Sequence, residues 1–203
     1  MLIAFAMRTF IGEAAIVPTS SMEGTILVGD HILLNKALYA PRVPFTDVRL
    51  PALKSVQRGE IIAFHYPRNP EINFIKRVVA RGGDVVEIKD DILYVNAIPQ
   101  YEPYAVHTRK SWLRSPETMS ARVVPPGHLF VLGDNRDNSD DSRYWGTVPV
   151  ENVIGEPLMV YFSYKAPTAE WLNESPLFKL KFYASMIVNL PDRTRWERTG
   201  KLL

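Results

Sequence analysis

A proline followed by three hydroxyl residues, Pro18-Thr19-Ser20-Ser21, is the first stretch of the chain that could carry out chemistry. Such residues compete with regular backbone hydrogen bonds, so the stretch is typical of a polar loop. A serine hydroxyl is also a nucleophile when a neighbouring base removes its proton. The stretch therefore indicates a loop before a strand predicted at 26–36, and one of its serines is a candidate nucleophile.

The candidate base is a lysine on an otherwise apolar strand face. Residues 73–81 have the composition of a strand, and because side chains alternate, Lys76 shares a face with Phe74, Val78 and Ala80. Burial on that face disfavours the ammonium form and lowers the pKa of the amine, which then can act as a base. The alternative is a lysine whose ammonium reaches water at the sheet edge. The strand alone leaves both interpretations open.

The densest polar block of the chain lies at 134–143, after an apolar strand predicted at 128–133. Its aspartates interleave with Arg136 and Arg143, a pattern that suits ion pairs fixing a loop. A calcium loop is disfavoured, because the central glycine and the closing glutamate of such loops are missing. We therefore predict neither a metal nor a cofactor.

A serine–histidine–aspartate triad is the other serine chemistry to consider. A triad is defined by geometry, so the sequence does not exclude it. The chain has four histidines, with no motif around them: His31, His65, His107 and His128. The triad is therefore the less favoured alternative.

The composition is that of a globular protein with many short strands. Of 203 residues, 46% are hydrophobic and 23% charged, and sixteen prolines favour strands and turns over long helices. A net charge of +2 without a long basic run gives no indication of nucleic acid. The absence of cysteine excludes disulfides and thiolate chemistry.

Strands are also predicted at 60–66, 84–89, 92–96 and 159–163, with a hairpin turn at Asp90-Asp91. The largely apolar run at 177–190 does not show whether it forms a helix or a strand.

The apolar run Met1–Met7 is too short to span a bilayer, which takes about 20 residues. It lacks the basic leader and the cleavage pattern of a secretory signal peptide. Two interpretations stay open, an element packed on the core and the C-terminal end of a membrane helix.

Several blocks resemble the bacterial type I signal peptidases and occur in that family's order. They are Ser21-Met22 before Gly29-Asp30, Lys76-Arg77-Val78 before Gly83-Asp84, and Gly133–Arg143 followed by Trp145-Gly146. The resemblance covers roughly residues 10–164, and its most specific part is the block that begins at Gly133.

The resemblance implies a membrane-bound serine endopeptidase that removes signal peptides from exported proteins with a serine–lysine dyad. On the matching positions, Ser21 is the nucleophile and Lys76 the general base. Ser139 is expected to hydrogen-bond the lysine amine and orient it. Asp141 and Arg143 are expected to support the site as an ion pair.

The oxyanion hole is expected to consist of the backbone N–H of Ser21 and the hydroxyl of Thr19, where family members usually carry serine. Gly24 departs from the family's usual proline, which loosens the turn after the nucleophile. The family places membrane helices before the nucleophile. We therefore interpret residues 1–17 as the remnant of an anchor and residues 18–203 as the catalytic domain.

The fold is predicted to be mainly β, with antiparallel strands in a partly closed, barrel-like sheet and a β-rich insertion at 87–126. The resemblance implies preprotein signal peptides as substrates, with small residues such as alanine one and three places before the cut. It also implies contact with the lipid bilayer and association with the secretion translocon. The expected location is the cytoplasmic membrane, with the catalytic part on the periplasmic or extracellular face.

Two other functions remain as alternatives. A self-cleaving regulator of the SOS-repressor type shares the dyad and a related β fold, but needs a DNA-binding or partner segment that residues 1–17 cannot supply. A non-catalytic member that only binds signal peptides is disfavoured by the presence of both Ser21 and Lys76.

Overall fold

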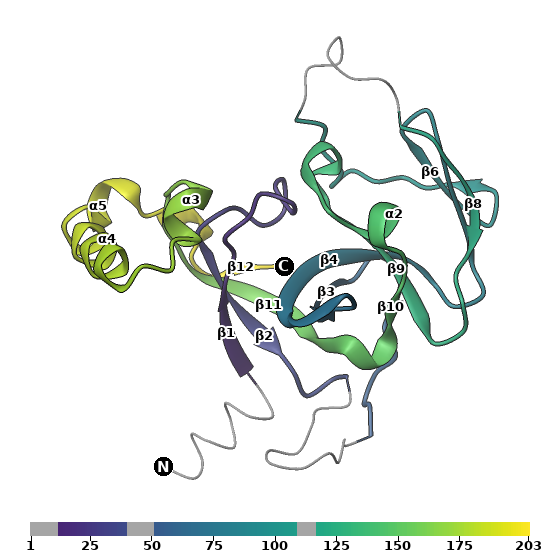
Figure 1. Cartoon of the computed structure of the whole chain (residues 1–203), viewed down its shortest axis with the longest axis horizontal. Coiled ribbons are helices and arrows are strands. Elements are labelled where there is room, and N and C mark those ends of the chain that lie inside the picture. Colours follow the sequence, from purple (N-terminus) through teal and green to yellow (C-terminus); the bar gives the residue numbers. More distant parts are fainter. Residues whose placement is uncertain (1–11, 40–50, 109–116) are drawn as a thin grey trace.

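The computed structural model describes residues 12–39, 51–108 and 117–203, which form two antiparallel sheets and a helical C-terminal segment (Figure 1). The larger sheet has the strand order β1-β2-β11-β3-β4-β9-β10, with β12 paired to β11. Its strands are β1 (Gly12–Ile16), β2 (Asp30–Asn35), β3 (Ile61–Tyr66), β4 (Asn69–Arg81), β9 (His128–Leu132), β10 (Val148–Pro149), β11 (Val153–Ser163) and β12 (Lys201–Leu202). The prediction of a mainly β, antiparallel fold is confirmed.

The larger sheet is open in the described part of the chain, because β1 pairs only with β2 and β10 only with β9. β11 joins its two halves by pairing with β2 through most of its length and with β3 through its first residues. Register shifts interrupt both pairings, and such irregularities bend a strand and increase its twist. No closed barrel forms among these residues, so only the coarser part of the predicted architecture is confirmed.

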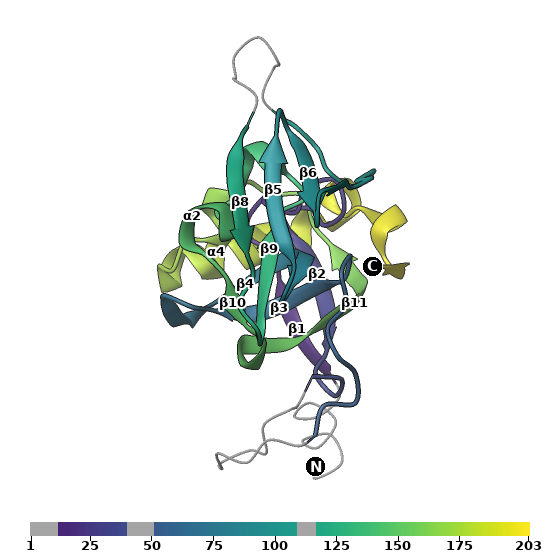
Figure 2. The ribbon, with the colours of Figure 1, turned by 90° about the vertical axis from the view of Figure 1, so that its right-hand side faces the viewer.

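The smaller sheet comes from a segment that overlaps the predicted insertion. Its order is β7-β6-β5-β8, and the strands are β5 (Val85–Lys89), β6 (Ile92–Val95), β7 (Ile98–Pro99) and β8 (Met119–Val123). Asp90 and Asp91 have φ angles of 48° and 68°, as the predicted tight hairpin requires. The smaller sheet packs its buried residues, among them Val86 and Leu93, against Ala80 of β4 and Phe130 of β9. Figure 2 shows β5, β6 and β8 next to one another above β9.

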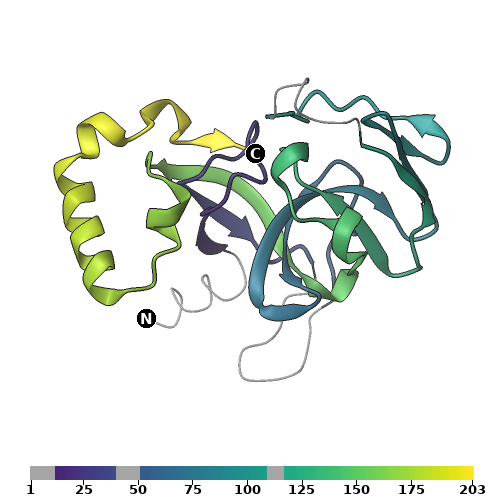
Figure 3. The same ribbon diagram turned by 45° about the horizontal axis from the view of Figure 1, so that its top comes forward.

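The remaining elements are short helices and one longer helix at the C-terminal end. They are η2 (Arg136–Asn138), α2 (Ser142–Trp145), η3 (Val150–Asn152), α3 (Thr168–Trp171), α4 (Pro176–Val188), α5 (Leu190–Arg193) and η4 (Trp196–Arg198). The ambiguous run at 177–190 is therefore mostly helical. In Figure 3 the α4–α5 segment and the smaller sheet lie at opposite ends of the molecule. None of the described helices combines the length and the apolar character that crossing a bilayer requires.

Two predicted segments differ from the observed structure at the N-terminal end. The strand expected at 26–36 begins at Asp30, because Gly29 turns the chain with a φ of 86° so close to Tyr164 that a Cβ would lie 1.9 Å from its carbonyl oxygen. β1 falls within the range assigned to an anchor remnant, and all of its residues pair with β2. The run Met1–Met7 lies outside the described residues.

Candidate active site

The serine stretch lies in the loop between β1 and β2. Backbone hydrogen bonds at its two ends and buried side chains hold this loop in place. The loop closes on itself because Val17 N–H donates to the carbonyl of Asp30 at 2.9 Å and Gly29 N–H donates to that of Val17 at 2.8 Å. Two residues of the loop, Met22 and Ile26, are buried in the core. These contacts hold Ser21 in place, with little of it exposed.

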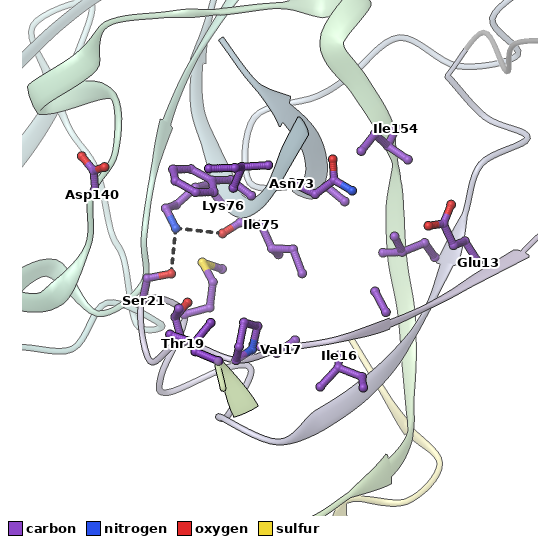
Figure 4. A pocket seen from close by; sticks show the side chains of 18 of the residues that line it. Glu13, Ile16, Val17, Thr19, Ser21, Asn73, Ile75, Lys76, Asp140 and Ile154 are labelled. Atoms are coloured by element: carbon purple, nitrogen blue, oxygen red, sulfur yellow. Dashed lines mark hydrogen bonds between the residues drawn. The ribbon is translucent and has the colours of Figure 1, made fainter. Parts of the chain in front are cut away.

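Lys76 lies on β4 beside this loop and is 4% exposed. Its Nζ donates to Ser21 Oγ at 2.7 Å and to the carbonyl of Ile75 at 3.2 Å (Figure 4). The ring centroid of Phe74 lies 5.1 Å from the same nitrogen. The lysine is therefore buried, and the alternative in which its ammonium reaches water at the sheet edge is wrong.

Burial lowers the pKa of Lys76 to about 8, against a usual value near 10.5. Carboxylates from the polar block act against this shift, with Asp141 first, followed by Asp140 and Asp134. These three aspartates lie outside β4, so the pattern of the strand alone does not reveal their effect on the pKa of Lys76. Desolvation nevertheless dominates, and a substantial fraction of the amine is neutral in weakly alkaline solution.

The polar block after β9 holds the serine loop directly. Asn135 donates its backbone N–H to the carbonyl of Ser21 at 3.1 Å and its side-chain amide to that of Ser20 at 3.2 Å. Asn138 donates to the hydroxyl of Ser20 at 2.7 Å. Gly133 makes the close approach possible, since a Cβ there would lie 2.5 Å from the carbonyl oxygen of Ser21. The two segments thus form one unit around the serine.

Asp141 and Arg143 form a buried ion pair within the polar block. Arg143 Nε lies 2.7 Å from Asp141 Oδ1, and Asp141 also accepts the N–H of Gly133 at 3.0 Å. The guanidinium extends to Glu117, whose carboxylate it contacts. The pair therefore connects the loop that approaches Ser21 to the chain leading into β8.

Two further ion pairs involve residues of the polar block, and the sequence pattern did not identify these pairs. Arg77 forms a bidentate ion pair with Asp134, with Nε 2.8 Å from Oδ1 and Nη2 2.6 Å from Oδ2. The pair connects β4, next to Lys76, to the polar block. Arg136 binds Glu102 in the same manner at 2.8 and 2.7 Å. Glu102, like Glu117, comes from the irregular part of the predicted insertion, where no periodicity marks a partner.

Ser139 differs from its expected arrangement. Its side chain is buried beside the dyad, but Oγ has no hydrogen-bond partner within the described residues, so the expected bond to the lysine amine is absent. The amine is directed instead to Ser21 and Ile75. The Ser139 hydroxyl lies against Gly133, where a Cβ would be 2.2 Å away.

A cleft of about 410 Å³ opens beside the dyad, and its lining is mostly apolar. It reaches from Ser21 and Lys76 past Thr19 to Glu13 and Ile154 on the far side (Figure 4). Small and aliphatic side chains line it, among them Ala15, Val17, Ala63 and Ile75. None of the four histidines is among the described residues of this lining. The cleft can therefore hold an extended, largely apolar peptide against a serine whose nearest base is a lysine.

A family model described as signal peptidase, peptidase S26, matches residues 1–162. The chain belongs to this family. It is 33% identical to a signal peptidase I of Aquifex aeolicus over 97% of this chain and 92% of that one. It is 35% identical to a signal peptidase I of Pseudomonas aeruginosa over 82% of this chain and 70% of that one. A solved signal peptidase I of Enterococcus faecalis is 38% identical and matches 51% of this chain and 97% of that one, with a TM-score of 0.43.

Membership of the signal peptidase family establishes the class of reaction. The family consists of membrane-associated serine endopeptidases that act on the signal peptides of preproteins. The chain is accordingly a hydrolase that cleaves signal peptides in protein secretion. The family match favours this function over a self-cleaving regulator.

Proposed function

We propose that the chain cleaves signal peptides with a dyad in which Ser21 is the nucleophile and Lys76 the general base. The observation that carries this proposal is the 2.7 Å contact between Lys76 Nζ and Ser21 Oγ at the buried end of an apolar cleft. The neutral amine takes the proton of Ser21, and Oγ attacks the scissile carbonyl. The amine then protonates the leaving amino group, and an acyl-enzyme forms. A water deprotonated by the same amine hydrolyses this ester.

The remaining residues of the site have supporting roles in this proposal. The N–H of Ser21 and the hydroxyl of Thr19 stabilise the oxyanion. Asp141 and Arg143 hold the polar block at its distance from the serine loop through their buried ion pair. Ser139 orients the lysine amine in this proposal, because its buried Oγ has no hydrogen-bond partner among the described residues and can accept from the lysine N–H groups if they reorient during proton transfer.

We propose further that the cleft selects small residues one and three places before the cut. Ala15, Val17 and Ala63 lie in its lining, and its limited volume is suited to short side chains near the dyad. Synthetic peptides with alanine at both places should be cleaved, whereas leucine at either place should lower kcat/KM by about 10²-fold or more through steric exclusion. Equal turnover of the leucine peptides would contradict this specificity without affecting the dyad.

Activity should depend on pH through the protonation of Lys76. Only the neutral amine can accept a proton, and its pKa is lowered to about 8, so kcat/KM should rise with pH through a midpoint near that value. Asp140 lines the cleft, and its carboxylate raises the pKa of the amine, so Asp140→Asn should move the midpoint to lower pH. Glu13→Gln, at the other end of the cleft, should leave the midpoint unchanged. A midpoint near 10.5 would contradict a buried base.

The place of the chain in the cell is also a proposal. We infer that residues 18–203 form the catalytic domain on the periplasmic or extracellular face of the cytoplasmic membrane. β1 begins at Gly12 and pairs with β2, which supports an anchor proposal limited to the residues before this strand. Contact with the bilayer and with the secretion translocon would bring membrane-embedded preproteins to the cleft. Carbonate extraction and protease protection of the expressed chain in vesicles test this location.

A further inference from the structure

Helix α4 near the C-terminal end has two apolar faces. One face packs on the core, where Phe182 is buried against Tyr164 and Trp171 and is flanked by Phe178 and Met186. These helix residues are spaced by four, as one face of a helix requires. The opposite face carries Leu180, Tyr183 and Ile187. A helix that needs only one apolar face to dock on the core therefore exposes a second one.

The outward face is strongly exposed. Leu180 is 69% and Ile187 70% exposed, and Leu177 and Val188 extend the same surface toward the two ends of the helix. We call these residues, with Tyr183, the α4 outer strip. The strip lies on the helical end of the molecule, away from the smaller sheet (Figures 1 and 3). A contiguous apolar surface of this kind marks an interaction site more often than scattered exposed residues do.

Charge borders the α4 outer strip on both sides. At about 100° per residue, Lys179 and Lys181 fall on opposite flanks of the strip. The segment 175–191 contains no aspartate and no glutamate. Lysine stems lie along an apolar surface while their ammonium groups reach outward to anionic headgroups. An apolar strip between two lysines suits the interface of an anionic bilayer better than a protein partner, which would be expected to require acidic counterparts.

The length of α4 determines how it meets a bilayer. Its 13 residues extend about 20 Å at about 1.5 Å per residue, less than the roughly 30 Å hydrocarbon core, so the helix lies along the surface and does not cross it. Leu172, between α3 and α4, is exposed and lines the cleft. Contact of α4 with lipid thus brings one wall of the cleft to the bilayer surface, an arrangement that suits a membrane-associated family acting on signal peptides.

We propose that the α4 outer strip is a docking surface for an anionic phospholipid bilayer. The test uses the full chain and the variant Leu180→Glu/Ile187→Glu. Its matched control is Ile98→Glu/Val123→Glu on the smaller sheet, where the replaced side chains are 63% and 68% exposed. Both variants add the same charge, and both retain residues 1–11. Any difference between them therefore isolates α4.

Co-sedimentation with phosphatidylglycerol/phosphatidylcholine vesicles should show the partition coefficient reduced about tenfold or more for the α4 variant and within about twofold for the control. Cleavage of a soluble signal-peptide substrate should be unchanged in both, so a failure of docking is distinguishable from a failure of the proposed catalytic function. Lys179→Gln/Lys181→Gln should lower binding to anionic vesicles several-fold. Binding of this lysine variant to pure phosphatidylcholine should equal that of the unmodified chain.

Equal vesicle binding by the α4 variant and the unmodified chain would overturn the proposal. So would a dimer in solution that the α4 variant disrupts while its lipid binding stays intact, because the strip would then meet a second copy. Circular dichroism checks that the glutamate variant folds. If that variant fails to fold, the lysine variant decides the outcome, and unchanged binding to anionic vesicles then overturns the proposal.

Discussion

Replacement of Lys76 by methionine is expected to lower kcat/KM for a signal-peptide substrate by roughly 10⁴-fold or more. The side chain keeps its length and its apolar contacts but loses the amine that lies 2.7 Å from Ser21 Oγ. A serine hydroxyl without a base is a weak nucleophile, and losses of this order follow when one member of a nucleophile–base pair is removed. Ser21→Ala should lower activity by a similar factor, and the double variant should lose little more, because the two residues act as a unit.

The free energy of unfolding of Lys76→Met distinguishes a catalytic role of Lys76 from a structural one. Below pH 8 the folded protein must hold an ammonium in a buried site, and this lowers the free energy of unfolding relative to a neutral side chain. The cost disappears only as pH rises toward the pKa of the unfolded lysine. Lys76→Met should therefore unfold at the same or a higher denaturant concentration than the unmodified chain at pH 7.

Lys76→Arg is the matched control for charge. A guanidinium stays protonated, so this variant should be inactive although it keeps a positive group on β4. Appreciable turnover by the methionine or the arginine variant would show that another residue removes the proton of Ser21.

The position of Lys76 could be predicted because the strand period is a local property. Alternation along β4 places Lys76 with Phe74 and Val78, and Arg77 on the opposite face where it meets Asp134. The turn at Asp90 and Asp91 is local in the same sense, because two residues between two apolar runs define a hairpin. In both cases a few consecutive residues were sufficient to predict the strand face or the turn, whereas the burial of Lys76 could not be predicted from the strand alone.

The partners of the arginines could not be predicted in this way. Arg136 binds Glu102 and Arg143 contacts Glu117, across sequence separations of 34 and 26 residues. The chain between β7 and β8 shows no period that would orient a glutamate. Only the approach of the smaller sheet to the polar block brings these carboxylates to the arginines. Side-chain pairing of this kind depends on tertiary structure and leaves no local trace.

The C-terminal run was ambiguous for a different reason. α4 is apolar on its buried face at Phe182 and apolar on its outer face at Leu180 and Ile187, so no single helical stripe stands out from the sequence. A period of 3.6 is recognised only when polar residues occupy the remaining faces. The two apolar faces of α4 therefore explain both why the sequence pattern did not indicate a helix and why the α4 outer strip is exposed.

Thr19→Val is expected to lower kcat by about 10²- to 10³-fold while KM changes little. Thr19 lies on the rim of the cleft two positions before Ser21, and both line it. Neither the hydroxyl of Thr19 nor the N–H of Ser21 donates a hydrogen bond to any other described residue, so both remain available to a substrate oxygen. Charge on that oxygen develops only as Ser21 attacks, so a lost donor affects the transition state more than the bound substrate.

The choice of valine removes the donor but keeps the branched shape of the side chain. Thr19→Ser restores the donor without the methyl group and should retain activity within a few-fold of the unmodified chain. Steady-state kinetics on one peptide at one pH, above the midpoint of the Lys76 titration, keep the amine neutral in all three proteins. A valine variant with unchanged kcat would show that the second oxyanion donor is another group. A fall in the serine variant equal to that in the valine variant would assign the effect to packing of the methyl group, because the hydroxyl is present in one and absent in the other.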